Sequence, residues 1–292
     1  MRRTAAIILF NSKLSIILLN TKQTYNTSLK KKNLKLQNFF ASLGRIIMNK
    51  TAIIIPSRLD ATRLPNKPPK LINNKEMILH VYEAAMKSNA GEVYVATPDK
   101  KIIDTVKKIG GNAILTAENH QTGTDRVFEV FKKNLNANPN IIVNLQGDMP
   151  NISPETINNL VDYMNKGHCE IGTLASKLNS NDELDDENVV KVLVKEKLKT
   201  GMFAKALDFV RLNNIQEFQA YHHIGIYAFT NKALSRYVGL KRSKLELERK
   251  LEQLRAMENG MSIHVGYVDS SPLSVDTEKD LEEIKKIMKT NE

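Results

Sequence analysis

A cluster of cationic side chains follows a short apolar segment that begins near residue 51. The stretch IIIPSRLDATRLPNKPPKL spans residues 53–71, and its cations include Arg58, Arg63 and Lys67. Cations that follow a buried strand are well placed to bind anions such as phosphate. The glycine-rich patterns GxxxxGK[ST] and GxGxxG are absent. We therefore expect the phosphates of a ligand to be held by these side chains on a proline-stiffened loop.

Two aspartates complement these cations. Asp148 ends the apolar stretch NIIVNLQGD, and Asp276 lies in SVDT, just before a predicted helix. Either residue alone could equally be a turn or helix cap. Mg²⁺, however, binds through one or two carboxylates and completes its shell with water and phosphate oxygens. Together with the cations, the two aspartates favour a site for Mg²⁺ and a nucleoside triphosphate.

These residue types suit nucleotidyl transfer. The cations would neutralise the β- and γ-phosphates as pyrophosphate leaves, and Mg²⁺ would screen the α-phosphate from an approaching nucleophile. Such a reaction depends on positioning and electrostatics, so it needs no Ser/His/Asp triad, and none is evident. The predicted catalytic residues are Arg58, Lys67 and Asp148.

Alternating strands and helices would position these residues. Stretches typical of strands lie at 51–56, 91–97, 112–116 and 140–148, and stretches typical of helices lie at 76–89, 100–110 and 125–135. This order predicts an α/β fold with a parallel sheet covered by helices on both faces. Ligands bind beyond the carboxyl ends of such strands, so the cationic loop, TGTDR and QGD should meet at one edge.

The second half has a mixed pattern. Strands are predicted at 169–178, 188–194, 222–230 and 262–269, and helices at 153–166, 245–260 and 277–289. The charge-rich helix 245–260 would place Arg255 on a solvated face. The acidic stretch NSNDELDDEN, residues 179–188, is interpreted as a solvated connection. Asp276 or Thr277 would cap the last helix.

The composition limits the classes of partner. The formal net charge is +11, but residues 1–47 contain nine Lys and Arg and no Asp or Glu, which leaves +2 on the rest. We therefore expect no nucleic-acid partner. The single cysteine, Cys169, excludes an internal disulfide and fits a reducing compartment such as the cytoplasm. We interpret it as a small apolar residue at the start of a strand.

Residues 1–47 are interpreted as a basic leader before a single domain at 48–292. The apolar stretches AAIILF and LSIILL are interrupted by Asn11 and Lys13, so no firm membrane association is expected. The acid-free composition suits an organellar transit peptide. A start assigned upstream of a true start at Met48 would give the same composition, and a weak membrane anchor is the third alternative.

Taken in order, the motifs resemble those of the 3-deoxy-manno-octulosonate cytidylyltransferase (CMP-KDO synthetase) family. The matching segments are IIIPSRLDATRLPNKP, TGTDR, IVNLQGDMP, HHIGIYAF, LEQLR and SVDTEKDLE, between about residues 51 and 288. The resemblance implies a nucleotide-diphospho-sugar transferase (Rossmann-like) fold with a mostly parallel sheet, in a Mg²⁺-dependent homodimer. It implies that 3-deoxy-D-manno-octulosonate (KDO) attacks the α-phosphorus of CTP, giving CMP-KDO and pyrophosphate for lipopolysaccharide biosynthesis.

The resemblance also assigns roles to individual residues. Arg58 and Lys67 match triphosphate-binding positions, and Asp148 and Asp276 match metal ligands. The stretch Gln121–Arg126 matches a loop beside the nucleotide, so Gln121, Thr122, Gly123 and Arg126 are expected to bind the nucleotide. Arg63 is expected to do the same because of its charge in the opening loop. The sugar-side positions are Gln146, Arg211, His223, Tyr227 and Glu246. An arginine suits the carboxylate of an acid sugar. Without the resemblance, a strand histidine such as His223 would be interpreted as a core residue.

The chain departs from the family's motifs at several positions. Asn66 replaces the glycine of RLPGKP, and asparagine tolerates the positive φ that such a turn needs. Pro98 occupies an aspartate position. On the sugar side, Asp208 stands for tyrosine, Val210 for serine, Lys244 for proline and Arg249 for glutamate. Two alternatives therefore stay open beside KDO transfer: another keto acid sugar as acceptor, or an inactive CTP-binding or dimerising paralogue.

Overall fold

The computed structural model describes residues 51–60, 64–135, 139–167, 169–178, 181–211 and 218–289. They belong to Asn49–Glu292, the second of two compact units into which the chain divides; the first is Met1–Met48. The predictions for the leader and for Arg63 lie outside the described residues.

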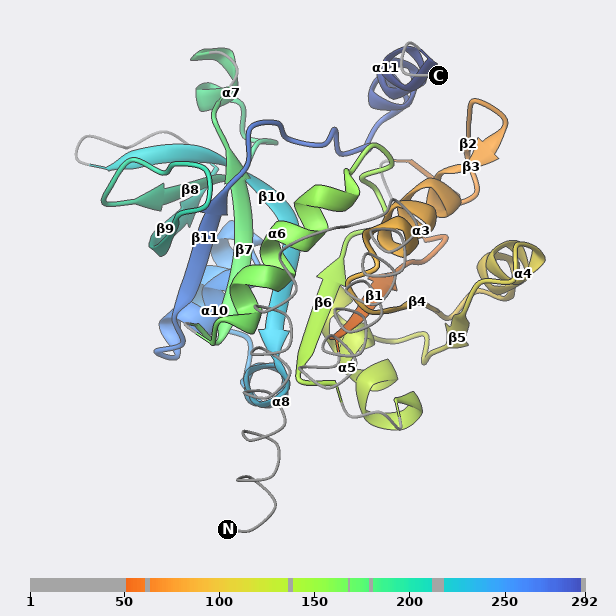
Figure 1. The fold of residues 1–292 in the computed structure, drawn as a ribbon, viewed down its shortest axis with the longest axis horizontal. Helices are drawn as coiled ribbons and strands as arrows, with labels where there is room; N and C mark the ends of the chain where they lie inside the picture. The colour runs from red at the N-terminus through yellow and green to blue at the C-terminus, as the bar shows by residue number, and fades with distance from the viewer. Residues whose placement is uncertain are drawn as a thin grey trace, which may run out of the picture. The chain divides into compact units, whose positions relative to one another are not determined.

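A large sheet forms the centre of the described region (Figure 1). Its strands run in the order β5-β4-β1-β6-β10-β7-β11-β9-β8. Their bounds are β1 Thr51–Pro56, β4 Glu92–Thr97, β5 Ala113–Leu115, β6 Ile141–Leu145, β7 Ile171–Ser176, β8 Lys191–Val194, β9 Phe203–Val210, β10 Gln219–Thr230 and β11 Ile263–Tyr267. Within this sheet β9 and β10 run opposite to the other strands, so its strands are mostly parallel in direction.

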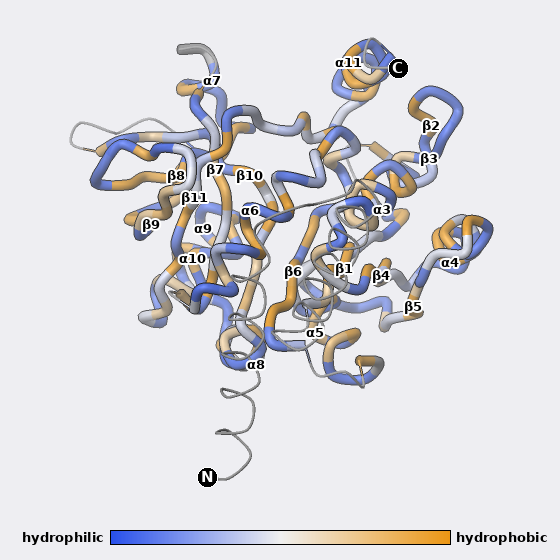
Figure 2. Tube along the Cα trace, in the orientation of Figure 1, coloured by the Kyte–Doolittle hydropathy of each residue, from blue (hydrophilic) through white to orange (hydrophobic). Residues whose placement is uncertain are grey.

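Helices cover both faces of the sheet. One face carries α3 (Met77–Ser88), α4 (Lys100–Lys108) and α6 (Pro154–Asn165), and the other carries α5 (Gly123–Asn134), α8 (Asn231–Val238) and α10 (Gln253–Glu258). Alternation along β1 explains the two cores, because Ile53 and Ile55 face the first and Ile54 faces the second. Figure 2 shows β1 and β6 coloured mostly as hydrophobic, as strands covered on both sides require.

The C-terminal segment returns to the opening loop. Helix α11 (Glu278–Lys289) buries Leu281 and Ile284 in a third apolar cluster, which includes Ile72 of the hairpin β2–β3 (Leu71–Ile72 and Lys75–Glu76). Just before α11, the N–H of Val275 donates to the carbonyl of Asp148 at 2.9 Å. This contact brings Asp276 beside the carboxyl end of β6.

The second half differs from the sequence prediction in several places. Residues 245–260 form two short helices, α9 (Lys244–Arg249) and α10, because Lys250 adopts a left-handed conformation with φ 54°. Arg255 is buried, with 2% exposure, so the prediction of a solvated face was wrong. The acidic connection contains a short helix, α7 (Asn181–Asp185). Strand β9 and helix α8 had not been predicted. None of the described helices has the length and apolarity needed to cross a bilayer.

Candidate active site

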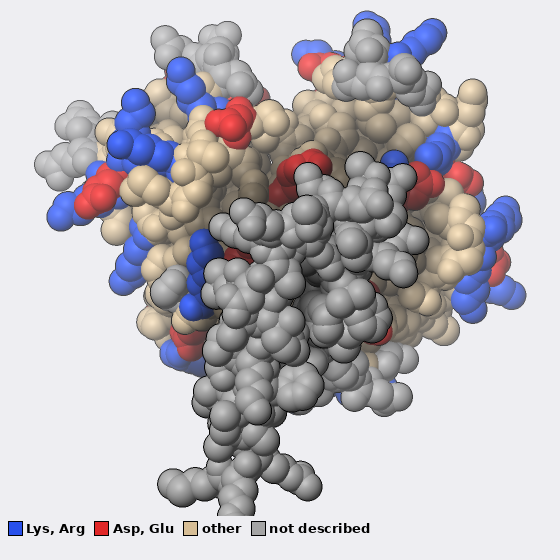
Figure 3. All heavy atoms as spheres, in the orientation of Figure 1, with Lys and Arg blue, Asp and Glu red and all other residues tan. Residues whose placement is uncertain are grey.

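A pocket of about 380 Å³ opens beyond the carboxyl ends of β1 and β6. Parallel strands place their following loops at this edge, so the opening loop, TGTDR and QGD meet there. The lining includes the predicted residues Arg58, Lys67, Gln121, Thr122, Gly123, Arg126, Gln146, Asp148 and Asp276. On the face shown in Figure 3, basic and acidic side chains are interspersed over the described surface. The described surface on that face therefore shows no broad patch of positive charge.

Lys67 lies between the two predicted metal ligands. Its Nζ atom is 3.0 Å from Asp148 Oδ2 and 3.1 Å from Asp276 Oδ1. Burial disfavours the charge of Lys67, but attraction to Asp148 and Asp276 outweighs it and raises the lysine pKa. The two carboxylates therefore already converge on one cationic group.

This donor set fits a divalent cation. Hard carboxylate oxygens are the ligands that Mg²⁺ prefers, and one or two of them suffice when phosphate oxygens and water complete the shell. The described residues contain no cluster of three or more His, Cys, Asp or Glu that could hold a metal by protein ligands alone. Thr277 caps α11, since its Oγ1 accepts from the N–H of Asp280 at 3.2 Å. The carboxylate of Asp276 instead accepts from Lys67 in the pocket.

The opening loop holds its shape without glycine. Asn66 adopts φ 55°, as its position in the turn requires, and its N–H donates to the carbonyl of Leu59 at 3.2 Å. The N–H of Leu59 in turn donates to Asp99 Oδ2 at 2.8 Å. Although Pro98 occupies an aspartate position of the family motif, the next residue supplies a carboxylate to the loop.

The TGTDR segment begins α5 and forms a second wall. Thr122 caps the helix, and its side chain accepts from the N–H of Asp125 at 3.2 Å. Arg126 is buried, donates to Thr116 Oγ1 and donates to the carbonyl of Ala117 at 2.9 Å. Burial, and then the charge of Arg58, lower the pKa of Arg126. The guanidinium therefore braces the wall and adds positive charge near Arg58.

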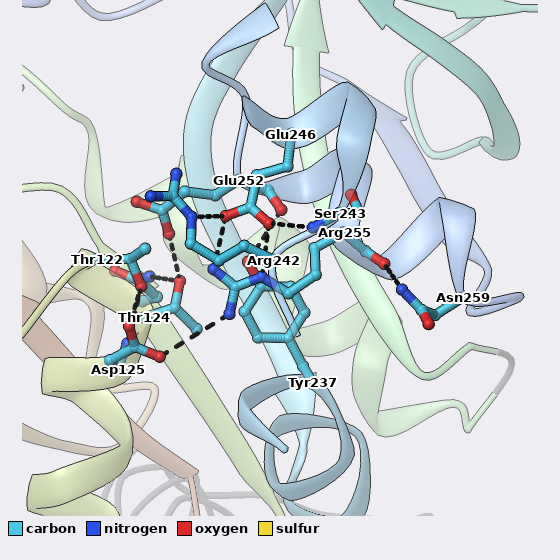
Figure 4. Close-up of polar contacts among 11 residues, drawn as sticks. Thr122, Thr124, Asp125, Tyr237, Arg242, Ser243, Glu246, Glu252, Arg255 and Asn259 are labelled. Atoms are coloured by element: carbon cyan, nitrogen blue, oxygen red, sulfur yellow. Dashed lines mark hydrogen bonds and ion pairs between the residues drawn. The ribbon is translucent and has the colours of Figure 1, made fainter. Parts of the chain in front are cut away.

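A buried ion pair connects α9 to the LEQLR segment, whose Glu252 lines the pocket (Figure 4). Arg255 donates to Glu246 from Nε at 2.8 Å and from Nη2 at 2.6 Å, and Arg242 donates to the same carboxylate at 2.9 Å. Glu246 is fully buried and is not part of the pocket lining. Burial raises the pKa of this carboxyl, but the hydrogen bonds from Arg255 and Arg242 outweigh it, so the pKa is lowered. The structure therefore does not bring Glu246, a predicted sugar-side residue, to the lining of the pocket.

Glu252 lines the pocket instead, and sequence reasoning did not select it. Its Oε2 accepts from Thr124 Oγ1 at 3.0 Å, and burial raises its pKa. Glu252 is the glutamate of LEQLR, so the motif itself contained the information that could have pointed to it.

Comparison with known proteins decides the family. Residues 52–263 match the family model described as cytidylyltransferase. A protein of Thermodesulfovibrio yellowstonii named 3-deoxy-manno-octulosonate cytidylyltransferase is 40% identical over 251 residues, which cover 82% of this chain and 98% of that protein. The chain belongs to the 3-deoxy-manno-octulosonate cytidylyltransferase family.

Further relatives agree with this assignment. The 3-deoxy-manno-octulosonate cytidylyltransferase of Bartonella henselae is 40% identical over 238 residues, covering 81% of this chain and 97% of that protein. A solved CMP:2-keto-3-deoxy-manno-octonic acid synthetase, complexed with CTP, is 35% identical with a TM-score of 0.75 and covers 83% of this chain and 100% of that chain. The predicted nucleotide-diphospho-sugar transferase fold and the predicted enzyme class, a cytidylyltransferase, are confirmed.

The remaining sugar-side positions that match this cytidylyltransferase family lie beyond the pocket lining. On β10, His223 Nε2 lies 3.0 Å from Thr173 Oγ1, and burial lowers the pKa of His223 to about 3, so the ring is neutral. The hydroxyl of Tyr227 is buried and has no hydrogen-bond partner among the described residues. Arg211, at the end of β9, donates to the carbonyl of Glu187 at 2.9 Å. Roles in sugar binding remain predictions for all three.

Proposed function

We propose that the protein transfers CMP from CTP to the anomeric hydroxyl of KDO, giving CMP-KDO and pyrophosphate for lipopolysaccharide biosynthesis. The observation that carries this proposal is the convergence of Lys67 with Asp148 and Asp276 at the end of the sheet where this family's motifs meet. Such an arrangement brings together a cation that can bind a triphosphate and the two carboxylates that can bind the accompanying Mg²⁺.

On the nucleotide side, the chain supplies fixed positive charge. Arg58 and Lys67 would neutralise the β- and γ-phosphates, and Arg63 would add a third cation from outside the described residues. Mg²⁺ held by Asp148 and Asp276 would supply Lewis-acid polarisation of the α-phosphate. Gly123 begins α5, so the N-terminus of this helix adds a favourable end for an anion.

On the acceptor side, Gln146 and Glu252 line the pocket, and we propose that they hydrogen-bond sugar hydroxyls. The Tyr227 hydroxyl is the kind of buried polar group that gains most from a polar ligand, because leaving it unpaired costs free energy. Arg211 would bind the carboxylate of the acid sugar. The departures at Asp208, Val210 and Arg249 keep a second acceptor, another keto acid sugar, as the alternative.

We also infer a homodimer. Large apolar side chains are exposed on or beside β9, β10 and α9: Met202, Leu207, Phe218 and Leu247. Exposed apolar groups of this kind mark interfaces when they form a patch. Light scattering of the full chain should give twice the monomer mass, and Leu207→Glu should shift it toward monomer. A wild-type monomer at micromolar concentration would reject the inference.

Pyrophosphate release tests the proposed reaction. The full chain is incubated with CTP, Mg²⁺ and KDO, with KDO omitted or replaced by other keto acid sugars such as a sialic acid in parallel. Release that requires KDO supports the proposal. Release only with another sugar would assign that acceptor instead. CTP binding by calorimetry without release from any acceptor would support an inactive paralogue.

A further inference from the structure

Two of the residues that depart from the family's motifs contact each other. Arg249 Nη1 lies 2.9 Å from Asp208 Oδ1 and 2.8 Å from Asp208 Oδ2, and it also lies 3.1 Å from the carbonyl of Phe209. Each of the two side chains is 34% exposed. The residues are 41 positions apart, on α9 and β9, so the contact exists only in the folded protein.

The backbone of β9 directs Asp208 toward this contact. The register between β8 and β9 shifts at this point, since Leu193 pairs with Asp208 but Val194 pairs with Ala206. The extra residue, Leu207, is therefore unpaired on β9. Such a bulge re-aims the neighbouring side chain.

The same pair is connected to Arg211. The carbonyl of Arg249 accepts from Arg211 Nε at 3.4 Å, while Arg211 Nη1 donates to the carbonyl of Glu187. The fully buried Lys191 donates to the carbonyl of Arg211 at 2.6 Å and to that of Asp186 at 2.6 Å. The backbone of Arg211 and its guanidinium are thus held by β8, the acidic connection and the end of α9.

The ion pair fixes the last of these supports. Arg249 is the final residue of α9, and Lys250 follows it in a left-handed conformation, so the chain direction changes at the carbonyl that Arg211 uses. Anchoring the Arg249 side chain on β9 restrains this turn. Without the anchor, the carbonyl would lose its fixed position, and Arg211 would lose one of the two side-chain hydrogen bonds that it makes to described residues.

We propose that Asp208 and Arg249 are positioning residues that hold Arg211 for the carboxylate of the acceptor sugar, an inference that rests on the proposed transfer to KDO. The contact between the two residues would thereby keep the acceptor side in working order. Nothing in the described structure accounts for the other change on β9, Val210.

Steady-state kinetics of the full chain tests the pair. Asp208→Ala and Arg249→Ala should each raise the KM for KDO roughly tenfold at saturating CTP, because small displacements of a substrate-positioning group weaken productive binding. The KM for CTP should change less than about twofold, because the triphosphate residues lie on other loops. Lys241→Ala is the matched control: it removes one positive charge at an exposed position just before the same helix and should leave both KM values unchanged.

The decisive experiment measures the coupling between Asp208 and Arg249. The double variant Asp208→Ala/Arg249→Ala should have a KM for KDO no higher than that of the more impaired single variant. The exchange Asp208→Arg/Arg249→Asp should restore most of the KDO affinity, since the carbonyl of residue 249 is retained. An unchanged KM for KDO, an equal rise in both KM values or simple additivity would overturn the proposal. A wild-type protein that releases no pyrophosphate with KDO would reject the proposed function itself and this assignment with it.

Discussion

Arg255 binds Glu246 through two hydrogen bonds in the interior of the protein, from Nε to Oε2 at 2.8 Å and from Nη2 to Oε1 at 2.6 Å. The guanidinium also lies over the ring of Tyr237, with 4.7 Å to the centroid. The pair joins α9 to α10 across the turn at Lys250. The LEQLR segment therefore supports the pocket wall from behind, while its Glu252 reaches the pocket.

Removing Arg255 should strongly destabilise the fold. Among the described residues, Arg255→Leu leaves the buried carboxylate of Glu246 with only Arg242 as a charged partner, which should cost about 3–5 kcal/mol of unfolding free energy. Urea unfolding measures this loss. The double variant Arg255→Leu/Glu246→Leu should recover part of the lost unfolding free energy, because neither buried charge of this pair remains. Lys285→Ala, at a surface ion pair of α11, is the control and should change stability little. A loss for Arg255→Leu no larger than that of the control would contradict the assignment.

Lys67 should compete with a divalent cation for the same carboxylates. Lys67→Ala should lower kcat/KM on the order of 100-fold, because a fixed charge on the triphosphate is lost. In the same variant, Mg²⁺ without nucleotide should raise the melting temperature more than in the wild type, since Asp148 and Asp276 no longer share an ammonium group. Lys70→Ala is the matched control, because Lys70 lies in the same loop but pairs with Glu278 at 2.8 Å. Equal Mg²⁺ responses in wild type and Lys67→Ala would show that the cation binds elsewhere.

The two aspartates should be required for metal-dependent activity. Chelation with EDTA should abolish pyrophosphate release, and excess Mg²⁺ should restore it. Asp148→Asn and Asp276→Asn should each reduce turnover by about 100-fold or more and raise the Mg²⁺ concentration needed for half-maximal activity. Asp104→Asn, at an exposed position of α4, should leave both quantities unchanged. Activity that survives EDTA would rule out a metal role for the pair.

Glu129 should make stability depend on acid pH. Burial disfavours its charge, but hydrogen bonds from His120, Ala117 and Lys133 outweigh this and lower the pKa of Glu129 to about 2. Because the carboxyl binds a proton more readily when unfolded, its stabilising contribution is complete above about pH 5 and is lost as the pH falls toward about 2. Glu129→Gln should therefore flatten the fall in unfolding free energy over this range, as measured by urea unfolding. Glu118→Gln, in the exposed connection nearby, should keep the wild-type slope; identical slopes in both variants would argue against the interaction.

The first half of the fold could be predicted from local patterns. The apolar runs of β1 and β6 and the spacing of α3 and α4 depend on neighbouring residues, so a single stretch carries the information. The location of the pocket followed as well, because parallel strands place their following loops at one edge. Asn66 adopts the positive φ that was predicted for its turn. In the second half, by contrast, the helical spacing of 245–260 concealed the left-handed break at Lys250.

The sequence alone identified the family's motifs, the α/β order and the cationic loop with its two aspartates, because those features are written in residue type and short spacing. Only the tertiary structure placed Lys67 between carboxylates 81 and 209 positions away. It likewise decided that Arg255 is buried, that Glu252 and not Glu246 lines the pocket, and that Asp208 meets Arg249. The physical reason is common to all of these: a charged side chain has the same local pattern whether it faces water or a partner, and the partner is chosen by the packing of elements distant in the chain.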